Sequence, residues 1–550
     1  MDEEYLNYYR WLYSIYSRKF SNPEKVLSAH IMEFVEKGYS LEEALKELYK
    51  RAYVSIYLPS LSISELLELS WNRLKRNPVL SIPVLFSEAA PALSTLAVLL
   101  IILALLTYFR QIGVFSEIIN GIMRGEYEVF LKPEVLNAIL VALVPVSLAV
   151  IVFYTLGQST CASFIYLLAE DSLKRGYCKL EEIWSKAVKN LPRVFIAILM
   201  KNLVVYVIPI SCFLAFIFLG LKYLDMLALI FSTLMFLFAI ILYIIAAEVA
   251  LIYVEPSIVI GSRDAIEAFK ESILLVRQNI SKALGYFLLQ VLVGIIIGSI
   301  SGTLSNFHIL FSEAATLILL LIVRPIFAVC LAGIYMSLTG RVFNASRLTE
   351  PKLLLVAGKL MGRGLKELVE LMKKPRWIVA ASAIFLLGAV GGFGLAQIGL
   401  KEILSQSVGL GKGKIFKEYF ALSIFTDIFF HNWRIAAFTT VSGIFTYAAP
   451  FSIALFNGMI IGAIAAVMPL LDLAIGIMPH GIIEIPGFLL ATAAGLRLAY
   501  KMYTGENRAE EVKKAAYVAL GLIPIFATAA FIEAFVTPLI IDIYLKSFCL

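Results

Sequence analysis

The sequence predicts an all-α, polytopic transmembrane helical bundle of about ten or eleven spans, with amphipathic elbow helices and a small soluble helical N-terminus. Of the 550 residues, 60% are hydrophobic and only 16% are charged, and the mean hydropathy is +0.86. An average soluble domain is about 45–50% apolar and about 25% charged, so one soluble core could not bury this surplus. These values exclude a soluble enzyme, a disordered chain and a fibrous repeat.

The charge pattern points to a membrane rather than to nucleic acid. The formal net charge of +7 comes from 47 Lys and Arg against 40 Asp and Glu, and the positive charge lies in short loops between apolar runs. Such loops are typical of membrane topology, so we expect membrane lipid and no nucleic acid among the partners. The five cysteines form no CxxC pair, which favours neither a disulfide framework nor a cysteine metal site.

Residues 1–60 predict a cytoplasmic segment of short helices. Ser40-Leu41-Glu42-Glu43 has the Ser-x-x-Glu form of a capping box, and the apolar residues after it fall on one helical face. The segment is polar before the first apolar run, so we expect no cleavable secretory signal.

Residues 61–345 predict a six-span membrane module. Basic loops alternate with loops that carry almost no positive charge, and positive loops remain in the cytoplasm. We therefore predict a multi-pass protein of the cell membrane with a cytoplasmic N-terminus. The six apolar runs cover about 83–108, 134–168, 193–221, 224–254, 281–305 and 309–339.

A weak internal repeat accompanies these runs. Each basic loop holds an amphipathic segment that leads through an Asn or Pro elbow into the next span. The copies are marked by Trp71 to Asn77-Pro78, Trp184 to Asn190-Leu191-Pro192 and Phe269 to Asn279, with a degenerate fourth at Lys373-Lys374-Pro375-Arg376-Trp377. The module is thus expected to repeat one elbow helix and two spans three times.

A basic amphipathic cytoplasmic linker at 346–376 is predicted to separate this module from a second one at 377–550. The second module has apolar runs at about 377–399, 436–468, 480–500 and 516–545, with a Gly/Lys-rich stretch at 409–414. Pro450 interrupts the run 436–468, so we expect a hairpin or a re-entrant pair there rather than one long helix.

Five short motifs follow one another in the second module. They are His431-Asn432 with Gly443, Phe456-Asn457-Gly458 with Gly462, Pro479-His480-Gly481-Ile482-Ile483-Glu484, Ala494-Gly495-Leu496-Arg497 and Ala530-Phe531-Ile532-Glu533-Ala534-Phe535. With these motifs the module resembles the stage II sporulation protein M family of integral membrane proteins over about residues 370–545. The resemblance implies a multi-span membrane protein, and the sporulation member of that family anchors wall-degrading partners. The long N-terminal module departs from the short form of the family.

Charged residues inside the predicted spans are candidate sites, because each costs a few kcal/mol unless it is paired. Lys201 and Glu248 lie at equal depth on successive spans, so they can meet as a buried ion pair, either a structural pin or a transport-coupling pair. Arg324 precedes Pro325 in mid-span. The proline frees the carbonyl of Leu321, so Arg324 is either satisfied inside the bundle or lines a wet cavity.

The second module holds a polar intramembrane cluster. His480 and Glu484 share a helix face at i and i+4, and counting along the spans brings them to the same depth as Glu533 and His431. Such groups could ligate zinc or activate water, or they could form a buried network that fixes helix register. The signal identifies neither a metal ligand set nor a catalytic residue. The predicted cluster comprises His431, Asn432, Asn457, His480, Glu484, Arg497 and Glu533.

Gly458 and Gly462 have the small-xxx-small spacing that lets helices pack closely, either within the bundle or in a homodimer. For the whole protein we expect a membrane scaffold or assembly factor that recruits partner proteins. The alternatives are a transporter or permease component with a polar intramembrane site, and an intramembrane His/Glu metal-dependent hydrolase. No ATP-binding motif or dinucleotide fingerprint is present, so we expect no cofactor.

Overall fold

The computed structural model confirms the all-helical, polytopic fold class. It describes residues 5–10, 12–13, 23–36, 38–57, 61–125, 127–223, 225–306, 311–341, 343, 353–397 and 421–547, and the regular elements in these ranges are all helices. The predicted Gly/Lys-rich stretch at 409–414 and residues 346–352 of the predicted linker lie outside the described residues.

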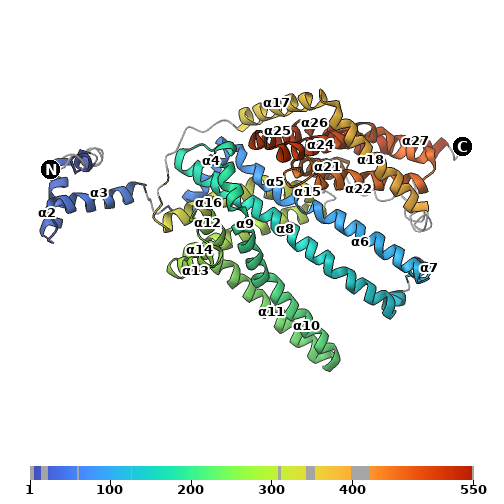
Figure 1. Cartoon of the computed structure of the whole chain (residues 1–550), viewed down its shortest axis with the longest axis horizontal. Coiled ribbons are helices and arrows are strands. Elements are labelled where there is room, and N and C mark those ends of the chain that lie inside the picture. Colours follow the sequence, from blue (N-terminus) through green and yellow to red (C-terminus); the bar gives the residue numbers. More distant parts are fainter. Residues whose placement is uncertain are drawn as a thin grey trace.

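The N-terminal helices α2 (Pro23–Glu36) and α3 (Leu41–Tyr57) form a unit with its own small core of Leu27, Phe34 and Leu45. The Ser40 backbone N–H donates to the Glu43 carboxylate at 3.0 Å, and the Glu43 N–H donates to Ser40 Oγ at 3.2 Å. This is the reciprocal pair of the predicted capping box. Figure 1 shows the unit apart from the main bundle.

The first membrane module runs from α4 to α16. Figure 1 shows two long pairs, α6 with α8 and α10 with α11, that leave the main body in different directions. The elements are α4 (Ile63–Arg76), η1 (Pro78–Ser81), α5 (Ile82–Ala89), α6 (Ala92–Gln111), α7 (Phe115–Arg124), η2 (Tyr127–Leu131), α8 (Pro133–Arg175), α9 (Leu180–Asn202), η3 (Leu203–Val207), α10 (Ile208–Tyr223), α11 (Met226–Ala250), α12 (Val254–Val259), α13 (Ala265–Gln278), α14 (Ile280–Asn306), α15 (Ser312–Ile318), η4 (Leu319–Val323) and α16 (Arg324–Leu338).

The predicted elbows form at two of the three repeat copies. Asn77 ends α4 and Asn279 ends α13, both in non-helical backbone. The predicted elbow at Asn190-Leu191-Pro192 is wrong, because α9 runs straight through it with Pro192 in its interior. Proline there removes the hydrogen bond to the Val188 carbonyl but does not end the helix. The degenerate fourth copy does bend, with Lys374 in non-helical backbone between α17 and α18.

The second module packs against the first along α21, which contacts α5 and α15. Figure 1 shows α17, α25, α26 and α24 gathered on one side of the molecule. The elements are α17 (Leu353–Met372), α18 (Pro375–Leu395), α21 (Ala421–Ser442), α22 (Ala448–Val467), α23 (Leu470–Gly476), α24 (Met478–Thr504), α25 (Arg508–Gly521), α26 (Ile523–Phe531), η7 (Ile532–Val536) and α27 (Thr537–Ser547).

Helices α18 and α22 run parallel and touch through their backbones. A Cβ added at Gly458 would lie 2.1 Å from the Phe385 carbonyl oxygen, and one at Gly462 would lie 1.9 Å from that of Ala389. Gly388 and Gly392 meet α22 just as closely. The small-residue spacing therefore serves packing within the bundle, and α18 occupies the face that a second copy would need.

Within the described ranges, nine helices are long and apolar enough to cross a membrane, or ten if the bent pair Ala97–Gln111 and Phe115–Gly121 forms one span. The expected eleventh span, the first arm of a hairpin at 436–449, is not formed. Helix α21 ends at Ser442 and α22 begins at Ala448, so the run is broken before Pro450. Helix α21 itself carries Asp427 and Arg434 and is not among the helices that are long and apolar enough to cross a membrane.

Candidate functional site

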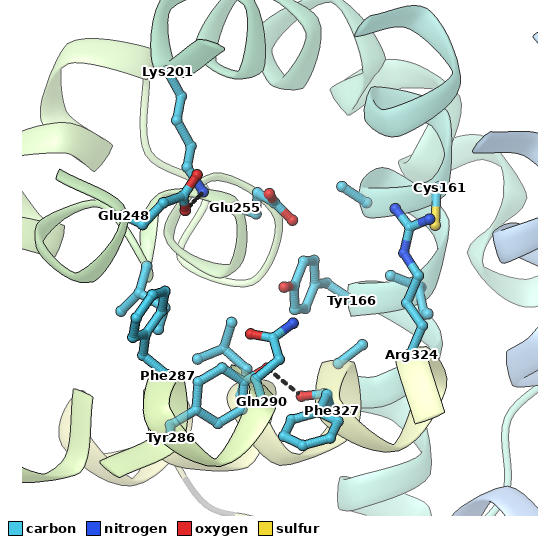
Figure 2. A pocket seen from close by; sticks show the side chains of 15 residues that line it. Cys161, Tyr166, Lys201, Glu248, Glu255, Tyr286, Phe287, Gln290, Arg324 and Phe327 are labelled. Carbon is cyan, nitrogen blue, oxygen red and sulfur yellow. Dashed lines mark hydrogen bonds and ion pairs between the residues drawn. The ribbon is translucent and has the colours of Figure 1, made fainter. Parts of the chain in front are cut away.

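The first module encloses a polar cavity of about 220 Å³. Helices α8, α9, α11, α12, α14 and α16 surround it, and Figure 2 shows their side chains projecting into it. Ionisable and polar groups line it, although most of them lie within candidate membrane spans. They are Tyr166, Lys201, Glu248, Glu255, Gln290 and Arg324.

Lys201 and Glu248 form the ion pair that their equal depth predicts. Lys201 Nζ lies 3.0 Å from Glu248 Oε2, and the side chains are 14% and 21% exposed. The Tyr206 hydroxyl donates to Glu248 Oε1 at 2.5 Å. Tyr206 belongs to the π-helical turn η3, and the Tyr243 hydroxyl donates to the Val204 carbonyl of the same turn at 3.0 Å. The tyrosine hydroxyls therefore hold both the Glu248 carboxylate and the turn η3 beside it in place.

Arg324 reaches the opposite side of the cavity from a widened helical turn. It follows the π-helical turn η4, and Pro325 frees the Leu321 carbonyl, which accepts a hydrogen bond from Ser81 Oγ at 2.7 Å. The Arg324 guanidinium donates to Ser87 Oγ at 2.7 Å and to the side-chain carbonyl of Gln158. Arg324 thus satisfies both alternatives left open by the sequence, because it is bonded within the bundle and lines a cavity.

Glu255 is the cavity residue that sequence reasoning missed. It lies just beyond the apolar run 224–254, so hydropathy alone does not mark it as a residue of a span, yet α12 turns it toward the cavity. Among the described residues it makes no hydrogen bond and no ion pair. Figure 2 shows Glu255 and Arg324 facing the cavity from different sides, with Tyr166 near its middle and Gln290 below it beside Phe327.

A second polar pocket, of about 360 Å³, lies in the C-terminal module. Helix α21 contributes Asp427, His431 and Asn432, helix α24 contributes His480 and Glu484, and the π-helical turn η7 contributes Glu533. The structure therefore brings together the four groups expected to converge, His431, His480, Glu484 and Glu533, together with Asn432. Asp427 is an additional member, which one turn of helix places beside His431.

The geometry of this second pocket is compact. His480 Nε2 lies 3.9 Å from Glu533 Oε2, and Asn432 Nδ2 donates to Glu484 Oε1 at 3.1 Å. One ligand atom from each of His480, Glu484 and Glu533 lies within 4.8 Å of the others. A one-histidine, two-carboxylate arrangement can hold a divalent ion or poise a water for proton transfer.

The rim of the second pocket connects the two modules. Glu313, at the start of α15, lies 2.9 Å from Arg434 Nη1 and 3.2 Å from His431 Nδ1. Ser312 Oγ also donates to Asp427 Oδ1 at 3.2 Å. This bridge could not be predicted from sequence, because Glu313 stands at the edge of an apolar run and its partners lie more than a hundred residues later.

Two predicted members of the cluster lie elsewhere. Arg497 is ~20 Å from Glu484 along α24, by ~1.5 Å per residue, so it cannot reach the pocket. It pairs instead with Glu511 of α25 at 2.7 Å. Nearby, partial burial and then the positive charge of Arg497 lower the pKa of Lys374. Asn457 lies on α22, which packs on α18, and it does not line the pocket.

The comparisons with known proteins find two families in this chain. The family model described as stage II sporulation protein M matches residues 381–538. The model described as a domain of unknown function (DUF7847) matches residues 61–360, which is more than half of the chain. No curated protein and no solved structure matches. The chain is a multi-span membrane protein that belongs to the DUF7847 family over residues 61–360 and carries a stage II sporulation protein M family domain over residues 381–538.

Proposed function

We propose that the protein is a membrane transport component whose first module binds a small zwitterionic solute in the cavity of Figure 2. The observation that carries this proposal is Glu255, an intramembrane carboxylate that makes no hydrogen bond and no ion pair among the described residues and shares a cavity with Arg324. A charged side chain inside a membrane is costly unless it is paired or serves a function. The cavity has carboxylates and cations on its wall, which suits a solute with both charges.

The size of the cavity limits the solute. Its volume of about 220 Å³ is below the ~300–1,000 Å³ typical of pockets for drug-sized ligands. Arg324 would receive an anionic group, since its guanidinium donors are held in place by Ser87 and Gln158. Glu255 would receive the cationic group. The pair of Lys201 and Glu248 would supply the polar wall that replaces water around the solute.

Thermal unfolding of the purified protein in detergent tests this binding. Alanine, proline and glycine betaine serve as zwitterionic probes, and acetate and methylammonium carry one charge each. We expect a zwitterion to raise the Tm, because a ligand at a hundred times its Kd stabilises the fold by about 2.7 kcal/mol. The shift should disappear in Glu255→Gln and persist in the control Glu134→Gln, whose residue is exposed at the start of α8. An equal shift in Glu255→Gln, or none with any zwitterion, would contradict the proposal.

Transport itself requires a second measurement. Liposomes that contain the protein should take up the stabilising zwitterion, and those that contain Glu255→Gln should not. Binding without uptake would support the solute site but contradict the transport role.

We also infer a recruiting function, because the α2–α3 unit stands apart from the bundle (Figure 1) and exposes Met32 and Leu41, with 54% and 52% of their surface accessible. A small helical unit with apolar surface on a cytoplasmic N-terminus would serve a membrane scaffold. Cross-linking in native membranes should then yield a protein partner with the full chain. The yield should fall when residues 1–57 are deleted or when Met32→Glu and Leu41→Glu are combined. An unchanged cross-linking pattern would argue against this role.

A further inference from the structure

We propose that His480, Glu484 and Glu533 of the C-terminal module bind a first-row divalent transition metal. The site is separate from the proposed solute cavity and belongs to the other module. It is built from two helical segments, because α24 supplies His480 and Glu484 from one face, and η7 supplies Glu533. Imidazole favours zinc, iron and nickel, and carboxylates add manganese to that group.

The spacing of the three side chains fits one ion. Two ligands of one ion are separated by at most twice the bond length, which is ~4.2 Å for bonds of ~2.1 Å. The three ligand atoms lie within 4.8 Å of one another, and His480 Nε2 lies 3.9 Å from Glu533 Oε2. Small side-chain rotations would therefore close the set around an ion. Asn432 holds Glu484 from the side at 3.1 Å, as an outer partner of a metal ligand does.

The charge of the pocket points to a cation. The lining carries the carboxylates of Asp427, Glu484 and Glu533, and no Lys or Arg among the described residues lines it. Carboxylates this close repel one another unless a cation or protons intervene. One bound cation would relieve the repulsion among these carboxylates, and His480 Nε2, 3.9 Å from Glu533 Oε2, faces the place where it would lie.

The backbone around the proposed metal site has two irregular features. Glu533 lies in a π-helical turn, a feature that often accompanies functional sites because it re-aims one side chain. Pro486 interrupts the hydrogen bonding of α24 two residues after Glu484 and leaves this end of the helix free to adjust. The remaining rim residue His431 is engaged by Glu313, so it stands outside the ligand set.

Binding of Co²⁺ to the full-length, EDTA-treated protein in detergent tests the proposal, because Co²⁺ reports its ligands through visible absorption. We expect one Co²⁺ per chain with a spectrum typical of nitrogen and oxygen ligands, displaced by one equivalent of Zn²⁺. His480→Gln and Glu533→Gln should each lower the affinity at least a hundredfold. Asn432→Ala should lower it about tenfold to a hundredfold, because it removes only the outer partner.

Matched controls separate the site from general metal uptake. His30→Gln on α2 and Glu370→Gln on α17 change the same residue types far from the pocket and should leave Co²⁺ affinity unchanged. Glu255→Gln should also leave it unchanged, so failure of the solute proposal and failure of this one are distinguishable. Wild-type protein that takes up no Co²⁺, Zn²⁺ or Mn²⁺ overturns the proposal whichever variants fold. Equal affinity in well-folded His480→Gln and Glu533→Gln overturns it as well.

Discussion

Arg497 Nη2 lies 2.7 Å from Glu511 Oε2, and the two side chains are only 9% and 8% exposed. The pair spans the turn at Gly505 that joins α24 to α25, and Lys514 Nζ lies 3.0 Å from the other oxygen of Glu511. Burying these charges is favourable only while they remain paired. The contact therefore fixes how the last two spans of the chain are placed against each other.

Replacing one member of this pair should be more harmful than replacing both. Glu511→Gln leaves the Arg497 charge buried, and we expect a loss of about 3–5 kcal/mol in the free energy of unfolding. The double variant Arg497→Met with Glu511→Leu should recover much of that loss. Thermal unfolding in detergent measures both. Glu506→Gln removes an exposed partner of Lys501 in the same turn and should change nothing measurable. A double variant as unstable as the single one would contradict this account.

The glycines of α18 provide a matched test of the backbone contact with α22. A Cβ at Gly392 would lie 2.0 Å from the Met459 carbonyl oxygen, whereas nothing lies within 4 Å of one at Gly391. We expect Gly392→Ala to destabilise the protein by about 1–3 kcal/mol, because the helices must separate. Gly391→Ala should be neutral or stabilising, because alanine favours a helix over glycine by about 0.5–1 kcal/mol. Equal unfolding temperatures for the two variants would mean that the helices are not in backbone contact.

Asn77 joins the first repeat of the N-terminal module to the second. Its Nδ2 donates to the Arg73 carbonyl at 2.9 Å and to the Gly176 carbonyl at 3.3 Å, and its Oδ1 accepts from the Cys178 N–H at 3.0 Å. Asn77→Ala leaves these buried groups without their partner, so we expect a loss of about 1–3 kcal/mol. Hydrogen exchange at 176–179 should increase. Asn279→Ala, at the corresponding elbow of the third repeat, is the control and should have the smaller effect.

The capping box of α3 should weaken at acidic pH. Hydrogen bonds from the Ser40 backbone N–H and hydroxyl lower the pKa of Glu43 below its usual value. Because the folded pKa is the lower one, the stabilisation is present above the unfolded pKa and is lost as pH falls through the folded pKa. Hydrogen exchange of residues 40–48 should therefore rise at low pH more than in Glu43→Gln, whose neutral amide keeps the cap. Equal pH dependence in the two proteins would refute this role.

Sequence reasoning predicted the features that depend on spacing along a helix or on depth within a span. Ser40 and Glu43 are three residues apart in a capping box, and Gly458 and Gly462 are four apart on a packed face. Lys201 and Glu248 meet because their depth can be counted from the ends of their spans. Depth also brought His480 and Glu484 to the level of Glu533.

Features that depend on rotation about the helix axis, or on the choice of neighbour, were not predictable. Arg497 is a different kind of error, because its distance from Glu484 along α24, ~20 Å at ~1.5 Å per residue, already excludes it from the polar cluster. Glu255 was not recognised as a cavity residue, because the apolar run 224–254 ends before helix α12 does. Asn190 and Pro192 show the elbow pattern, but α9 continues through them without a break, since local residues alone do not decide whether a proline ends a packed helix.

The bridge at Glu313 connects the two pockets through one helical segment. Glu313 begins the segment that leads through η4 to Arg324, so one continuous element contacts the rim of the second pocket and the wall of the first. If the proposed ion and the proposed solute both bind, any factor by which the ion changes the affinity for the solute must equal the factor by which the solute changes the affinity for the ion. This segment is the physical path along which an ion gradient would then act on the solute.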